Sequence, residues 1–86
     1  MASTLIMRGM EFEPGIARWK QVAAIMRARI ADGTYPPGER VPSVMEVVEE
    51  FGIAQATAQK VLRALREEGL TFTEPGIGSS VRRVGS

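Results

Sequence analysis

Residues 52–69 read GIAQATAQKVLRALREEG, a segment bounded by two glycines that has a clear helical repeat. Within it Ala58, Val61, Leu62 and Leu65 recur at the i, i+3, i+4, i+7 spacing of one helix face, which we expect to meet a hydrophobic core. The opposite face carries amides, a hydroxyl and cations that can donate hydrogen bonds: Gln55, Thr57, Gln59, Lys60 and Arg63. Such a face could read DNA, but taken alone a polar face opposite an apolar stripe is more often only a solvated surface.

Length and composition exclude several classes of protein. Eighty-six residues bury one modest core, with no room for a separate catalytic or ligand-binding domain. Because the chain has no cysteine and no histidine, thiol nucleophiles, disulfides, histidine bases and the usual zinc ligand sets are excluded. We predict no catalytic residues, no metal site and no cofactor. The net charge of +1 does not by itself indicate a nucleic-acid binder. With neither a leader nor an apolar run of about 18 residues, a cytoplasmic protein without membrane contact is expected.

The first residues are set apart from the rest. Residues 1–15 show no sustained period and end at Pro14-Gly15. Their apolar side chains suit packing against the domain or pairing with a second chain, and a frayed terminus is an equal alternative. We therefore predict an N-terminal arm, disordered or dimer-forming, followed by a domain over residues 16–84.

The domain opens with a predicted amphipathic helix over residues 16–32. Its core stripe follows steps of three and four residues: Ile16, Trp19, Ala23, Met26 and Ile30. Trp19 is expected to anchor the helix in the core. Lys20, Arg27 and Arg29 lie off the stripe, and we expect them to be solvated, with contact to a phosphate as the alternative.

A connector and a short second helix follow. The connector is dense in proline and glycine and cannot be helical. Ser43 and Glu46 have the spacing of a capping box, so a helix is predicted from Ser43 to Phe51, where Gly52 ends it. Two short helices joined at a glycine, the second over residues 54–68, are typical of a helix-turn-helix, whose second helix enters the major groove.

A β-hairpin completes the predicted domain. Residues 70–73 alternate apolar and polar side chains, residues 74–78 form a turn that includes Gly76 and Gly78, and residues 79–84 return. A hairpin after a helix-turn-helix is a wing, which commonly lies along the phosphate backbone or in the minor groove. The sequence thus predicts a mainly α fold with a small β-hairpin, a winged helix-turn-helix of three helices plus an antiparallel wing.

Several separated motifs together resemble the DNA-binding domain of the GntR family of bacterial transcription regulators. In order and spacing they are Gly33-x-x-x-Pro37-Gly38-Glu39-Arg40-Val41-Pro42-Ser43, Gly52-Ile53, Val61-Leu62-x-x-Leu65, Glu68-Gly69-Leu70 and Gly78-x-x-Val81. The resemblance covers roughly residues 16–83. It implies a bacterial, nucleoid-associated regulator, a repressor or an activator, that binds double-stranded DNA at a palindromic operator as a homodimer.

The chain departs from the family pattern at the positions that contact bases. Met45, Gln55 and Gln59 stand where the family usually has arginine, and only Thr57 matches the usual recognition residues. The resemblance thus assigns base reading to Gln55, Thr57 and Gln59. Glutamine pairs with adenine whereas arginine favours guanine, so our hypothesis is an operator richer in A·T. Ala54 also lacks a capping hydroxyl, which we expect to cost the helix about 1 kcal/mol.

Phosphate contacts are expected from residues spread along the chain: Arg40, Ser43, Lys60, Arg63, Arg82 and Arg83. The wing tip carries Glu74 and no cation. With so few cations per subunit, we expect a monomer to bind weakly and with strong salt dependence. Each neutralised phosphate contributes about 0.9 to the slope of log affinity against log salt.

The chain ends at Ser86, whereas family members usually carry a larger effector-binding and dimerising domain after the wing. No small-molecule effector is therefore implied. Dimer formation is expected from the arm, the first helix, the wing, cooperative binding on adjacent sites or a partner protein.

An alternative function is a winged helix used as a protein-interaction or assembly module, with weak or no specific DNA binding. The arrangement of charges discriminates between the two functions. A single positive surface formed by Lys60, Arg63, Arg82 and Arg83 favours DNA, and its interruption by Glu46, Glu49, Glu50 and Glu74 favours the module. An enzyme is not predicted, because the adjacent helical pairs Glu49-Glu50 and Glu67-Glu68 point about 100° apart and are expected to be solvated.

Overall fold

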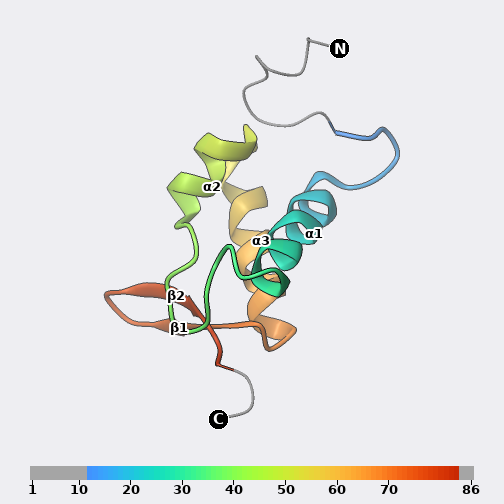
Figure 1. The fold of residues 1–86 in the computed structure, drawn as a ribbon. Coiled ribbons are helices and arrows are strands. Elements are labelled where there is room, and N and C mark those ends of the chain that lie inside the picture. Colours follow the sequence, from blue (N-terminus) through green and yellow to red (C-terminus); the bar gives the residue numbers. More distant parts are fainter. Residues whose placement is uncertain (1–11, 84–86) are drawn as a thin grey trace.

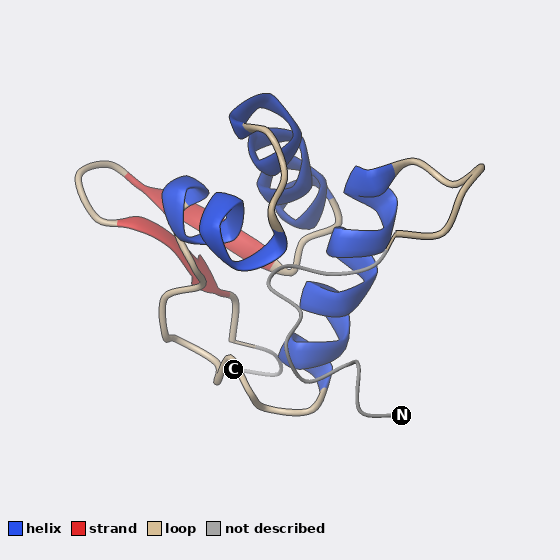
Figure 2. Cartoon of the chain, turned by 90° about the horizontal axis from the view of Figure 1, so that it is seen from above, coloured by secondary structure: helices blue, strands red, loops and turns tan. Residues whose placement is uncertain are grey.

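Residues 12–83 are described by the computed structural model, and they form three helices followed by an antiparallel hairpin (Figure 1). The helices are α1 (Arg18–Ala31), α2 (Val44–Phe51) and α3 (Gln55–Glu67), and the strands are β1 (Thr71–Glu74) and β2 (Gly78–Val81). Helix α3 packs against α1, α2 and β1, and Figure 2 shows the hairpin projecting on the side of the molecule away from α1. The predicted winged helix-turn-helix fold is confirmed. Most of the predicted arm, residues 1–11, lies outside the described residues.

The hydrophobic core forms where α3 packs against α1 and α2. Ala58, Val61 and Leu65 of α3 are fully buried, as their spacing predicts. Each buried valine or leucine side chain contributes about 1.5–3 kcal/mol relative to an exposed one, so this stripe fixes α3 in the domain. Leu62 is only half-buried, because it lies at the edge of the stripe that faces the wing rather than at its centre.

The start and end of α2 are set by its flanking residues. The Ser43 hydroxyl accepts a hydrogen bond from the Glu46 amide at 3.2 Å, and the Glu46 carboxylate accepts one from the Ser43 amide at 2.8 Å. This is the predicted capping box. Gly52 has a left-handed φ of 66°, which ends the helix after eight residues and turns the chain into α3.

Helix α1 begins two residues later than predicted, and this moves Ile16 out of the core. Ile16 lies in the turn before the helix and is 46% exposed, so its assignment to the core stripe was wrong. Ala23 and Met26 are fully buried, while Trp19 and Ile30 are half-buried and pack against the core. The stripe is therefore real but starts at Trp19.

Two cations of α1 are engaged in ion pairs, so the expectation that they are merely solvated was wrong. Arg27 binds Glu68 through two parallel hydrogen bonds of 2.8 Å, which hold the pKa of that carboxyl below its usual value. Arg29 binds Glu50 at 2.7 Å and donates to the Tyr35 hydroxyl at 2.7 Å. These contacts tie α1 to the end of α3, to α2 and to the connector.

The hairpin has one more strand-like neighbour than the sequence predicts. Its register pairs Thr71 with Val81 and Glu74 with Gly78. The other edge of β2 is paired by the connector, where the Val41 amide donates to the Ser79 carbonyl at 2.9 Å. Strand β1 starts after residue 70, because the amide of that residue still bonds the end of α3. The wing is thereby fixed to the segment that leads into α2.

Candidate nucleic-acid interface

The exposed side of α3 carries two of the three predicted base-reading residues. Gln55 and Gln59 are exposed and four residues apart, which places them one above the other on one side of the first two turns. Thr57 is half-buried, so only part of its surface is open to a ligand. Ala54 caps the helix without a side-chain hydrogen bond, as predicted, and its backbone is already extended as an N-cap requires.

A groove runs between α3 and the wing beside these glutamines. Its volume is about 320 Å³, and it is lined by residues of α2, α3 and both strands: Val44, Gln59, Leu62, Arg63, Arg66, Thr73 and Ser79. Within the described part of the chain this lining holds two arginines and no acid. Because a groove with unopposed guanidinium groups attracts anions, it is the part of the surface best suited to phosphate.

Arg66 is the residue of this groove that sequence analysis missed. Its Nη1 donates to the Thr73 hydroxyl at 3.2 Å, and the Thr73 and Ser79 hydroxyl oxygens lie 3.4 Å apart. Arg66 follows Gln59 by seven residues, so it shares the same helix face. That spacing was visible in the sequence, whereas the hydroxyls opposite it depend on the hairpin register.

The side chain of Lys60 does not line the groove but lies next to α1. Its Nζ lies 5.0 Å from the centroid of the Trp19 ring, which the Nζ of Lys20 also approaches at 5.9 Å. A cation over an aromatic face is stabilised by the ring quadrupole by about 0.5–1 kcal/mol at an exposed site. Trp19 is thus half-buried against the core and lies close to two lysines.

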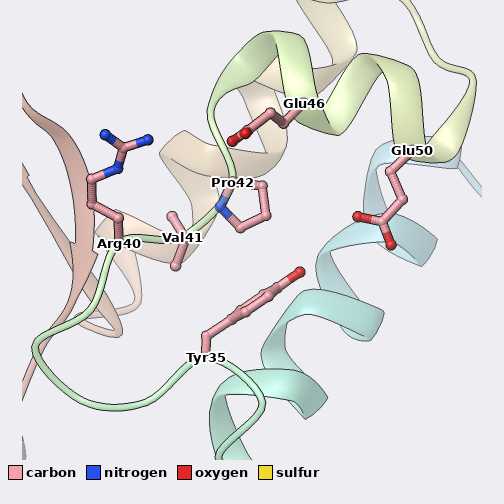
Figure 3. A pocket seen from close by; sticks show the side chains of 6 residues that line it. All are labelled: Tyr35, Arg40, Val41, Pro42, Glu46 and Glu50. Atoms are coloured by element: carbon pink, nitrogen blue, oxygen red, sulfur yellow. The ribbon is translucent and has the colours of Figure 1, made fainter.

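Arg40 and Ser43 lie at the other edge of the wing, close to the start of α2. The Ser43 hydroxyl accepts a hydrogen bond from the Glu46 amide, so it is part of the cap of α2. The guanidinium of Arg40 stands near the carboxylate of Glu46 in Figure 3. The pKa of that carboxyl is lowered, first by the Ser43 amide and to a lesser degree by the charge of Arg40.

The last two predicted phosphate contacts, Arg82 and Arg83, lie at the base of the hairpin and not at its tip. The Arg82 amide closes the hairpin by donating to the Leu70 carbonyl at 2.9 Å. The guanidinium of Arg83 lies against Gly38, where a Cβ atom would come within 2.7 Å of its Nη2. Gly38 has a φ of 83°, so its backbone conformation favours glycine, whereas the end of the flexible Arg83 side chain could move aside for a Cβ atom.

The wing tip is a tight turn with an apolar end. The Ile77 amide donates to the Glu74 carbonyl at 3.0 Å across Pro75 and Gly76, and Gly76 has the positive φ of 79° that such a turn needs. Gly78 follows with a φ of 117°. Ile77 is 53% exposed at the end of the projecting hairpin (Figure 1).

The predicted cations have different near neighbours in the structure. Arg63 lines the groove, Lys60 faces Trp19, and Arg82 and Arg83 lie at the base of the hairpin. Of the acids named as possible interruptions, Glu50 is paired with α1 and Glu46 is bound at the start of α2. None of them lines the groove among residues 12–83, so Arg63 and Arg66 share the groove with no acidic lining residue.

A second hollow of about 440 Å³ lies between the connector and α2 (Figure 3). It is lined by Tyr35, Arg40, Val41, Pro42, Glu46 and Glu50. Its lining carries charges of both signs, and its two acids already have partners: Glu50 pairs with Arg29, and Glu46 accepts from the Ser43 amide. Over residues 12–83 no group of three or more acidic side chains has the arrangement of a metal site. None of the described helices is long and apolar enough to cross a membrane.

Comparison with known proteins agrees with this arrangement. The family described as "Bacterial regulatory proteins, gntR family" matches residues 18–81. An uncharacterized HTH-type transcriptional regulator of Rhizobium meliloti is 33% identical over 79 residues, which are 92% of this chain and 32% of that protein. The histidine utilization repressor of Pseudomonas putida is 38% identical over 68 residues, 79% of this chain and 26% of the repressor.

A solved structure extends the comparison to DNA. BusR of S. agalactiae, in complex with its busAB-promotor DNA, is 25% identical with a TM-score of 0.72, over 79% of this chain and 33% of BusR. This chain thus spans about a third or less of these proteins. The matching family consists of regulators, in agreement with the prediction that the domain is not an enzyme. The chain belongs to the GntR family of bacterial regulatory proteins, as a winged helix-turn-helix DNA-binding domain of a transcription regulator.

Proposed function

We propose that this domain recognises a specific operator by placing the first two turns of α3 in the major groove of DNA. The observation that carries the proposal is the exposed pair Gln55 and Gln59 beside a groove that holds Arg63 and Arg66 without an acid. Amide side chains at the start of the helix can meet base edges while the arginines meet the backbone. We infer that it acts on DNA in the bacterial cytoplasm.

The exposed glutamines favour adenine. A glutamine amide donates to N7 and accepts from N6 of adenine in a bidentate pair, whereas guanine offers two acceptors that suit arginine. Each such pair contributes about 1–3 kcal/mol of discrimination. The half-exposed Thr57 adds a hydroxyl that meets either a base or a phosphate. We therefore propose A·T pairs opposite Gln55 and Gln59.

The operator is proposed to be an inverted repeat bound by two copies of the domain. A single α3 presents few base contacts, and the chain has a net charge of only +1, so we expect one domain to have little affinity of its own. Two half-sites about 34 Å apart let two weak contacts act together on one face of the duplex.

Selection from a pool of random duplexes tests this proposal. The purified protein is titrated against the pool at low and at moderate salt, and the retained duplexes are sequenced. The expected result is an inverted repeat with about ten base pairs between half-site centres. Enrichment of no sequence, with all binding lost at moderate salt, would indicate only non-specific phosphate contact and would refute operator recognition.

A protein-interaction module is the second candidate function, and the exposed apolar side chains favour it. Met45 on α2 is 58% exposed and Ile77 on the wing tip is 53% exposed, in a chain whose net charge is only +1. If the selection enriches nothing, the substitution Ile77→Ser should weaken capture of a partner protein while leaving the thermal stability unchanged. If the selection yields an operator, this candidate is not needed.

A further inference from the structure

We propose that Arg63, Arg66 and the hydroxyls of Thr73 and Ser79 form a binding site for one backbone phosphate of DNA, which we call the phosphate clasp. The clasp joins α3 to the wing. This proposal rests on the proposed function, because the ligand of the clasp is the backbone of the DNA duplex that α3 is proposed to read. Neither Arg66 nor the two hydroxyls were expected from the sequence.

The donors of the clasp converge on one groove and remain available. Arg66 uses one N–H on the Thr73 hydroxyl at 3.2 Å, and a guanidinium has five such donors in a fixed fork. Arg27 and Arg29 are each paired with a carboxylate at 2.7–2.8 Å. Among residues 12–83 neither arginine of the clasp has such a partner. The clasp therefore presents positive charge without an internal anion to satisfy it.

The chemistry of the groove suits a phosphate diester better than a carboxylate or a free ion. Two guanidinium groups and two hydroxyls approach from three elements, so they can surround the unesterified oxygens of one tetrahedral phosphate. Gln59 lines the same groove, which places a base-reading amide next to the clasp. A nucleic-acid strand carries its phosphates and its base edges close together, so one strand could meet both the clasp and Gln59. Inorganic phosphate has no base for Gln59 to contact.

The clasp also couples the wing to the recognition helix. The link from Arg66 to Thr73, and from Thr73 to Ser79, already crosses from α3 to β1 and then to β2. A phosphate bound by groups on both sides would strengthen this link. The wing is therefore held against α3 when DNA is bound, and the tip at Ile77 is held at a fixed distance from the glutamines.

Three variants test the clasp by the salt dependence of DNA binding. Arg66→Gln should weaken binding on the order of tenfold and lower the slope of log affinity against log salt by about 0.9. Thr73→Val keeps the charge and the strand, so it should weaken binding severalfold with an unchanged slope. Arg27→Gln is the control: it also removes one arginine charge, but that guanidinium is already bound to Glu68, so the salt slope should not change.

Duplexes with a single neutral methylphosphonate linkage locate the phosphate. The linkage is placed at each position of the bound site in turn, and its effect is measured on the wild type and on Arg66→Gln. One position should weaken the wild type on the order of tenfold and leave the variant unaffected. If every position weakens both proteins equally, or if the variant keeps the wild-type slope, the clasp is refuted.

Two further outcomes separate the clasp from the proposed function and from a free ion. A lower slope for Arg66→Gln, with no operator preference in the wild type, would support the clasp and refute base reading. A wild type that binds no duplex at all would overturn both. Inorganic phosphate at constant ionic strength should displace DNA only weakly, and displacement at micromolar phosphate would assign the groove to the free ion and overturn the clasp.

Discussion

Replacing Thr71 by valine should stabilise the domain, because this threonine buries a hydroxyl without using it. Thr71 is 1% exposed at the start of β1, opposite the buried Val81, and its Oγ1 has no hydrogen-bond partner among residues 12–83. A buried hydroxyl without a partner costs about 1–3 kcal/mol. Valine has the same branching, fills the space with a methyl group and favours a strand.

We therefore expect Thr71→Val to raise the free energy of unfolding by about 1–2 kcal/mol. In a domain of this size each kcal/mol corresponds to about 4–8 °C in the melting temperature. Thermal and urea unfolding followed by circular dichroism measure the change. Thr73→Val is the contrasting variant on the same strand, because the exposed Thr73 hydroxyl accepts a hydrogen bond from Arg66, so its removal should not stabilise the domain. A Thr71→Val variant that melts at or below the wild-type temperature would show that the hydroxyl is satisfied in solution and would refute the reasoning.

Three other variants probe the cap of α3, the ion pair at its end and the cation beside Trp19. Ala54→Ser supplies the missing cap and should raise the free energy of unfolding by about 1 kcal/mol; no gain in urea unfolding would mean that the helix start is already satisfied. The pKa of Glu68 is lowered by Arg27 in the folded state, so the pair stabilises the protein above about pH 4.5 and loses its effect as the pH falls through the folded pKa. Both side chains are about two-fifths exposed, so Arg27→Gln should lower the free energy of unfolding by less than about 1 kcal/mol at neutral pH. If this loss is as large in acid as at neutral pH, the Arg27–Glu68 ion pair is not its cause. Lys60→Ala should weaken DNA binding evenly across sequences and lower the salt slope by about 1, and a change in base preference would contradict a phosphate role.

The local features of the fold were predictable because they depend on residues close in sequence. The hydroxyl of Ser43 and the carboxylate of Glu46 are three positions apart, and this spacing alone defines the capping box that the structure contains. Gly52 is likewise required by the left-handed turn between α2 and α3. The stripe that includes Val61 and Leu65 follows from helical geometry and is fully buried.

The features that the sequence did not predict depend on contacts between distant segments. The connector pairs with β2 through Arg40 and Ser80. These residues are forty positions apart with two helices between them, so no local sequence pattern predicts that they pair. Arg29 was expected in water because its helix face is polar, but that face meets Glu50 of α2. Whether a charged residue is solvated or paired depends on which element packs beside it.

The candidate site shows the same division. Gln55 and Gln59 could be placed on an exposed helix face from their spacing, and the structure leaves both exposed. Arg66 lies on that face too, but its relation to Thr73 depends on how the hairpin returns past α3. Lys60 was grouped with the phosphate contacts, and its proximity to Trp19 could not be seen without the packing of α1 against α3.

The substitution Gln55→Arg tests most directly whether α3 reads bases. The random-duplex selection is carried out in parallel on the wild type and on this variant, under the same salt. Because arginine favours guanine and glutamine favours adenine, we predict that one position in each half-site changes from A·T to G·C while the others stay the same. An identical set of selected sequences for the two proteins would contradict the claim that this face of α3 recognises the operator.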